Sequence, residues 1–391
     1  MTELITKGFL FPNDIEVHWS LMIVLYPYIT GLVAGAFIVS SLYHVFGRTE
    51  LKPVAKFSLV AAFSFLMFAC TPLLFHLGHP ERAFNIMFTP KFTSAMSGFG
   101  YIYSFYLLLV LCEIWFVFRE DIIRKVRETR GIVKACYWVL ALGSLDDSEE
   151  ARRLDHSITS VLAAIGIPSA CVLHGYVGFL FGSLKSNPWW STPLMPVIFL
   201  MSAIVSGIAI LIVGYFIVMK VRGTDPDAAC LQSLYKYLWG FFIIDLTLEL
   251  LELLTMVYEG EESWAIIAWL LKDKLWFSYT TVQMLICSGI PLVLLGLVSL
   301  KPMDSLMRNR LGLISSALIL LQVFAMRWNV VVGGQLFSKS LRGLTSYTPD
   351  VIGRESIVMA AILFIMPFVV MYVFNLILPL WNKDQPESTT V

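Results

Sequence analysis

The sequence contains few charged residues. Asp, Glu, Lys and Arg make up 14% of its 391 residues, whereas a water-soluble domain usually carries about 25%. Hydrophobic residues account for 58%, and the mean hydropathy is +0.76. A soluble protein is therefore excluded, because most of the exterior must face something other than water. The composition predicts an all-α integral membrane protein.

Three further absences narrow the function. Neither sign of charge is in excess, with 28 basic and 28 acidic residues, so nothing indicates binding to nucleic acid. The six cysteines have no CxxC or other ligand spacing, so we expect neither a metal site nor an iron–sulfur cluster in this chain. A signal peptide is not expected either, because the first apolar run is too long and no cleavage motif follows it.

Nine apolar stretches are long enough to cross a bilayer, which takes about 20 helical residues. They cover residues 19–46, 55–78, 96–118, 157–184, 191–219, 235–258, 276–299, 311–334 and 355–381. The apolar piece 132–143 is shorter. We expect it to lie at the membrane interface, with a tenth span as the alternative.

The loops on the two sides of the membrane differ in Lys and Arg. Those on the side opposite the N-terminus hold 18, against nine on the N-terminal side. Because cytoplasmic loops are enriched in Lys and Arg, we expect the N-terminus outside and the C-terminus in the cytoplasm, in the cytoplasmic membrane. The chain then divides into an outer segment (1–18), a first helical bundle (19–184) with a cytoplasmic loop (119–156), a second bundle (185–334), and an outer loop, last span and cytoplasmic tail (335–391).

Three carboxylates stand in the sixth span, where an isolated charge is costly. Asp245, Glu249 and Glu252 are four and three residues apart, so they share one helix face. Such a row can pass protons; the alternative is that Arg327 in the eighth span neutralises one member. Two further candidates for a proton path lie on the inner half: Glu113 and His44.

Polar and aromatic groups from five helices gather in the outer half of the membrane, judging depth at about 1.5 Å per residue. An amphipathic redox ring with polar oxygens suits this environment. The candidates are His18, Trp19, His76, His174, Tyr176 and Arg327. A b-type haem would need two histidines at matching depth on facing helices, and His174 has no clear partner, so we expect no haem. A secondary transporter should show interrupted helices at corresponding positions of both halves, and the prolines show no such symmetry.

Three motifs carry a resemblance to a known family. PLLFHLGHPERAFNIM (Pro72–Met87), HGYVGFLFG with NPWWSTPLMPVIFLMSAIVSG (Asn187–Gly207), and RWNVVVGGQ (Arg327–Gln335) lie in order across the chain. Together they resemble the NrfD/PsrC family, the membrane subunits of polysulfide reductase and its relatives. The length is most similar to the branch with DsrP of the DsrMKJOP complex and the Hdr-like menaquinol oxidoreductase.

The resemblance implies two four-helix bundles without a bound cofactor. It implies that menaquinone is bound as a substrate and exchanges electrons with a ferredoxin-like 4Fe–4S subunit on the outer face. The other partners would be subunits of a DsrMKJOP-type complex of sulfur metabolism, including cytochromes. The family's quinone-contacting tyrosine matches Tyr176, whereas its polar first-helix contacts match the apolar Leu21 and Val24. A structural anchor for redox partners is therefore the alternative function.

Overall fold

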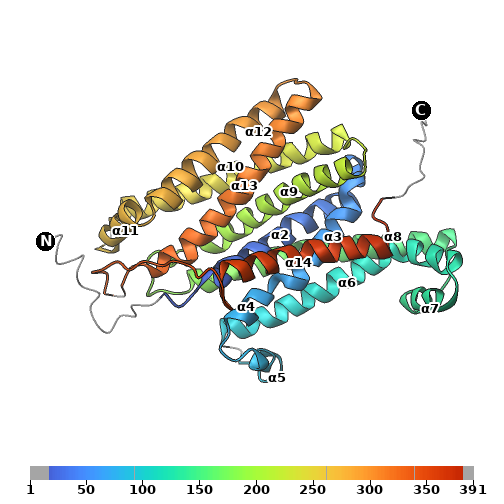
Figure 1. Cartoon of the computed structure of the whole chain (residues 1–391), viewed down its shortest axis with the longest axis horizontal. Coiled ribbons are helices and arrows are strands. Elements are labelled where there is room, and N and C mark those ends of the chain that lie inside the picture. Colours follow the sequence, from blue (N-terminus) through green and yellow to red (C-terminus); the bar gives the residue numbers. More distant parts are fainter. Residues whose placement is uncertain (1–16, 92, 261, 339, 382–391) are drawn as a thin grey trace.

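The structure is a computed structural model that describes residues 17–91, 93–260, 262–338 and 340–381 (Figure 1). Most of the predicted outer segment 1–18 and the end of the predicted tail lie outside these residues. Eight helical segments in the described part are long and apolar enough to cross a membrane. They are Leu21–His44, Thr49–His76, Ala95–Glu128, Glu149–Gly182, Met195–Val221, Trp276–Leu300, Ser305–Gln335 and Ile357–Ile377. The prediction of an all-α integral membrane protein is confirmed.

Several of these segments consist of more than one helix. The second contains a 3-10 turn (η1, Thr49–Leu51), α3 (Lys52–Ala69) and α4 (Thr71–His76). The sixth contains a π-helix (η3, Trp276–Gly289) followed by α12 (Ile290–Leu300). The seventh contains α13 (Ser305–Val331) and a 3-10 turn (η4, Gly333–Gln335). The remaining segments are α2 (Leu21–His44), α6 (Ala95–Glu128), α8 (Glu149–Gly182), α9 (Met195–Val221) and α14 (Ile357–Ile377).

The remaining predicted span, 235–258, corresponds to α10 (Ala228–Glu259), which has 32 residues. This helix is long enough to cross a bilayer, but the three carboxylates predicted to share its face interrupt its apolar character. It is not among the eight segments, so the count of nine spans stays a prediction. After α10 follows the shorter α11 (Glu262–Asp273).

The long helices pack as two sets of four (Figure 1). In the first set, α2 contacts α3 and α8, and α6 contacts α8 and α3. In the second, α9 contacts α10 and α13, while α12 contacts α10 and α13. The two sets meet mainly where α2 and α8 pack on α9, and α14 lies against α3. At the α2–α9 contact Gly35 faces Gly207, where an added Cβ on Gly207 would be 2.5 Å from the Cα of Gly35. Only glycine allows the two backbones to approach this closely.

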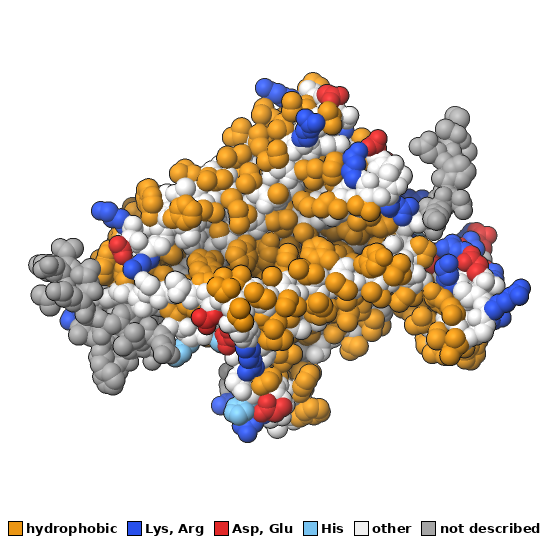
Figure 2. All heavy atoms as spheres, in the orientation of Figure 1, with side chains coloured by type: hydrophobic (Ala, Val, Ile, Leu, Met, Phe, Trp, Pro, Cys, Tyr) orange, Lys and Arg blue, Asp and Glu red, His pale blue; other side chains and the backbone are white. Residues whose placement is uncertain are grey.

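The predicted cytoplasmic loop 119–156 is mostly helical, and its position on the cytoplasmic side stays a prediction. It contains the last turns of α6, a short apolar helix α7 (Gly131–Leu140) and the first turns of α8. Ion pairs hold this region together beyond the apolar spans: Arg119 pairs with Asp155 at 2.8 Å and Arg127 with Asp147 at 2.6 Å. Figure 2 shows hydrophobic side chains over the middle of the molecule and charged ones towards its ends.

Candidate functional site

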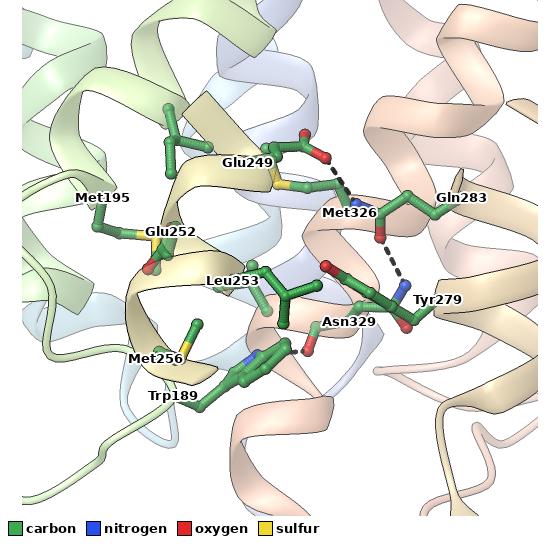
Figure 3. A pocket seen from close by; sticks show the side chains of 12 residues that line it. Trp189, Met195, Glu249, Glu252, Leu253, Met256, Tyr279, Gln283, Met326 and Asn329 are labelled. Atoms are coloured by element: carbon green, nitrogen blue, oxygen red, sulfur yellow. Dashed lines mark hydrogen bonds between the residues drawn. The ribbon is translucent and has the colours of Figure 1, made fainter. Parts of the chain in front are cut away.

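A pocket lies within the second set of helices, between α9, α10, η3 and α13 (Figure 3). It contains about 440 Å³ of empty space, part of it open to the surroundings. Most of its lining is apolar or aromatic: Trp189, Met195, Ile198, Leu253, Met256, Tyr279, Met326 and Val330. Four polar side chains converge on it: Glu249, Glu252, Gln283 and Asn329. An apolar pocket with a few converging polar groups is the usual form of a small-molecule site.

Glu249 is held by amide groups rather than by a cation. Its Oε2 accepts a hydrogen bond from Nε2 of Gln283 at 2.9 Å. Nε2 of Gln322 donates to both oxygens, at 3.1 and 3.3 Å. All three side chains are buried. Hydrogen bonds to a carboxylate are stronger than bonds between neutral groups, so these contacts fix the carboxylate at the pocket wall.

The network continues along the pocket to α13. Asn329 donates from Nδ2 to Oε1 of Gln283 at 2.8 Å, and its own Oδ1 accepts from Oγ of Ser278 at 2.7 Å. The indole of Trp189 donates to the Asn329 carbonyl at 3.0 Å. A chain of hydrogen-bonded polar groups therefore runs from Ser278 to Glu249.

The π-helix positions the residues that η3 contributes. It has 14 residues, which is unusually long because π-helices mostly occur as single turns. Such turns are frequent at functional sites. Oγ of Ser288 donates to the carbonyl of Gln283, five residues earlier, at 2.7 Å. Tyr279 and Gln283 both face the pocket.

A second buried polar group lies next to the pocket. The Arg327 guanidinium donates to Oγ of Ser202 at 2.7 Å and to the Phe199 carbonyl at 3.2 Å, and it lies over the Phe199 ring at 3.7 Å. Asp245 is 0% exposed, and neither of its carboxylate oxygens has a hydrogen-bond partner.

The alternative in which Arg327 neutralises a carboxylate of the row stays a prediction. In the described residues Arg327 forms no ion pair: one terminal nitrogen bonds to α9, its Nε has no hydrogen-bond partner, and amides bond Glu249. Its charge acts on Asp245 and Glu249 only at longer range. The three carboxylates are all buried on one side of α10, as their spacing predicts.

Glu113 and His44 lie in the other set of helices. Glu113 is buried in α6 without a partner for either oxygen, and His44 ends α2. Within the described ranges, no hydrogen bond or ion pair joins their side chains to the row on α10. A path through these two residues stays a prediction.

The predicted quinone residues of α8 point in different directions. Tyr176 donates from its hydroxyl to the Ala95 carbonyl at 2.7 Å and lies against Gly98 of α6, where an added Cβ would be 2.5 Å from the hydroxyl. His174 is buried, its Nε2 has no hydrogen-bond partner, and the charge of Arg327 acts on it. The structure therefore places His174 near Arg327 but does not place Tyr176 in the pocket.

The other predicted residues lie at the ends of the helices. Trp19 stacks on Trp190 with ring centroids 5.0 Å apart, and its backbone exchanges hydrogen bonds with the Gln335 amide at 2.9 and 3.1 Å. His76 pairs with Glu355 at 2.9 Å. His18 is exposed just before α2. None of these side chains lines the pocket.

Sequence reasoning missed the amides and aromatics that complete the pocket. Trp189, Tyr279, Gln283 and Asn329 line it, and Gln322 bonds Glu249. A signal was present, because a glutamine inside an apolar span needs a buried partner just as a carboxylate does.

The fold and pocket define a multi-pass helical membrane protein with a buried polar site in its second set of helices. Residues 12–339 match a family model described as "Polysulphide reductase, NrfD". The chain belongs to the NrfD family.

Three relatives add detail. The chain is 30% identical over 389 residues to a selenate reductase subunit of Mesobacillus selenatarsenatis, covering 95% of this chain and 88% of the relative. It is 25% identical to "Protein NrfD" of Escherichia coli, over 57% of this chain and 67% of the relative. It is 22% identical to the "Hdr-like menaquinol oxidoreductase integral membrane subunit" of Archaeoglobus fulgidus, over 59% of this chain and 49% of the relative. Family and relatives identify a membrane subunit of redox complexes, while the DsrP branch stays a prediction.

Proposed function

We propose that the chain oxidises menaquinol in the pocket between α9, α10, η3 and α13 and passes the electrons to an iron–sulfur partner. The observation that carries this proposal is the carboxylate of Glu249, fixed by two amides at the wall of an apolar pocket. The bicyclic head group of menaquinol combines apolar faces with two polar oxygens, which matches this lining.

The chemistry needs acceptors for protons as well as electrons. Oxidation of a quinol to a quinone releases two electrons and two protons. Glu249 and Glu252 are the pocket's ionisable carboxyl groups and can accept the protons, while the Tyr279 hydroxyl can donate a hydrogen bond to the quinone oxygen. Since the cysteines show no cluster spacing, we assign the electron acceptor to a ferredoxin-like 4Fe–4S subunit. We assign its docking site to the outer face, because the pocket lies towards the end of α10 that is predicted to face outward.

The likeness to a selenate reductase subunit over nearly the whole chain favours a complex in which a catalytic partner uses these electrons to reduce an oxyanion. A DsrMKJOP-type complex of sulfur metabolism is the alternative. Affinity purification of the chain from its native membrane, followed by identification of the proteins that accompany it, distinguishes the two.

The experiment measures menaquinol-driven reduction of the partner cluster in the assembled complex. Glu249→Gln removes the proton acceptor, and we expect kcat/KM to fall by about 10²–10⁴-fold, the range for a lost general base. Glu259→Gln is the matched control, because this glutamate ends the same helix in an exposed position. It should leave turnover unchanged.

Two tyrosine variants distinguish the pocket from the position implied by the family match. Under our proposal Tyr279→Phe raises KM, while Tyr176→Phe leaves turnover unchanged because its hydroxyl serves the α8–α6 contact. The reverse result would move the quinone to the interface of α6 and α8. Normal turnover in all four variants would favour a structural anchor, which the burial of the apolar Leu21 and Val24 also suits.

A further inference from the structure

A second hollow lies at the opposite end of the second set of helices, independent of the proposed quinone site. It occupies the turn between α12 and α13 and the adjoining start of α10, and contains about 640 Å³ of empty space that opens to the surroundings. Its lining is Gln232, Ser299, Leu300, Lys301, Pro302, Met303 and Arg308. The turn lies at the top of Figure 1, and Figure 2 shows Lys and Arg side chains there among hydrophobic ones.

The hollow is lined by polar atoms without partners. Nε of Arg308, Oγ of Ser299 and Oε1 of Gln232 are buried and have no hydrogen-bond partner. The other end of the Gln232 amide is occupied, because Nε2 donates to the Val298 carbonyl at 3.2 Å. These three atoms therefore leave hydrogen-bonding capacity around one hollow that a bound molecule can use.

The charges at the hollow are all positive. Lys301 and Arg308 contribute two cations, and no lining residue is acidic. The nearby Asp304 does not line the hollow; its Oδ2 accepts a hydrogen bond from the backbone N–H of Leu306 at 3.1 Å at the start of α13. Arginine and lysine donors matched to an anion are typical of phosphate recognition.

The uncharged groups indicate what accompanies the phosphate. Oε1 of Gln232 can only accept a hydrogen bond, and the Ser299 hydroxyl can donate or accept. A head group with hydroxyls fits both groups. An ammonium head group does not, because its positive charge would lie beside the positive charges of Lys301 and Arg308. The ligand chemistry is therefore a phosphodiester with a hydroxylated substituent.

The surroundings indicate that this ligand is a lipid. Leu300 is 70% exposed at the rim, and Leu306 and Met307 are also exposed. These side chains offer apolar surface for acyl chains beside the hollow. The turn 301–304 is on the side predicted to be cytoplasmic, where basic pockets between membrane helices bind anionic head groups.

We propose that the hollow formed by Gln232, Ser299, Lys301 and Arg308 binds the phosphate of an anionic lipid with a hydroxylated head group, such as phosphatidylglycerol.

Native mass spectrometry of the delipidated full chain tests this site. Dioleoyl phosphatidylglycerol, dioleoyl phosphatidylethanolamine and inorganic phosphate are titrated separately. We expect one phosphatidylglycerol to bind at least tenfold more tightly than either other probe. Arg308→Gln should weaken that binding by about tenfold, or 1.4 kcal/mol, while Arg308→Lys keeps part of it. Arg310→Gln is the matched control, because this exposed arginine on the same helix does not line the hollow.

Each contrary result overturns a stated part of the inference. If phosphatidylethanolamine bound as tightly as phosphatidylglycerol, the assignment of an anionic head group with hydroxyls would be overturned. Inorganic phosphate binding as tightly as the lipid would assign the site to free phosphate. Equal losses in Arg308→Gln and Arg310→Gln would show general surface attraction instead of a site. The unfolding temperature of each variant is compared with that of wild type. An unchanged temperature shows that a loss of binding does not come from a loss of fold.

Discussion

Replacing Arg327 with leucine should strongly destabilise the second set of helices. The side chain is 1% exposed, and its guanidinium makes two hydrogen bonds to α9 and lies over the Phe199 ring. Its charge also balances nearby carboxylates at longer range. Hydrogen bonds to charged groups are each worth about 1.5–3 kcal/mol, so the loss of both predicts a cost of about 3–6 kcal/mol for Arg327→Leu.

The free energy of unfolding can be measured by titrating SDS into mixed micelles of the purified chain. Arg327→Lys keeps the charge, but a lysine has no planar fork with which to reach both Ser202 and the Phe199 carbonyl. Its expected loss is about 1.5–3 kcal/mol, the value of one hydrogen bond to a charged group. Adding Asp245→Leu to Arg327→Leu should restore part of the loss, because the unbalanced carboxylate is then also gone.

A loss below about 1 kcal/mol for Arg327→Leu would refute the reasoning, because this is only the usual effect of a point mutation. A double variant as unstable as the sum of its two single variants would show that Asp245 and Arg327 act independently.

Two further predictions concern the carboxylate row and the contact between the two sets. In proteoliposomes containing the whole complex, Asp245→Asn should lower proton uptake at equal electron flux while quinone still binds; equal uptake would remove Asp245 from any proton path. Gly207→Ala should cost about 1–3 kcal/mol of unfolding free energy through overpacking, because the new Cβ meets the Gly35 backbone. Gly240→Ala is the control, since nothing lies within 4 Å of an added Cβ there, and a cost equal to that of Gly207→Ala would contradict the steric explanation.

The sequence allowed the membrane helices to be located but not their ends. Length and apolar content identify a span, since both follow from the thickness of the bilayer. Where a helix stops outside the membrane depends instead on pairing between distant residues. The contact of Arg119 with Asp155 extends α6 and α8 together, and no local pattern in either helix reports it.

The same limit applies to the site. The spacing of Asp245, Glu249 and Glu252 was enough to predict a buried row, because helical periodicity is local. The partners of Glu249 could not be predicted, since Gln283 and Gln322 come from two other helices. A π-helix also changes which residues of η3 share a face, so an α-helical projection of that segment fails.

Glu249 and Asp245 differ in their hydrogen bonding, and this difference allows ligand binding to be separated from proton movement. Glu249 is bonded to two amides, so any replacement disturbs the wall of the pocket together with its proton chemistry. Asp245 is one turn away along α10 and makes no hydrogen bond, so replacing it with asparagine breaks no contact of the pocket. A variant at Asp245 therefore reports on charge alone. A loss of proton uptake there with unchanged quinone affinity would assign proton transfer to the interior of α10, whereas a joint loss of both at Glu249 follows from its bonding and cannot separate the two roles.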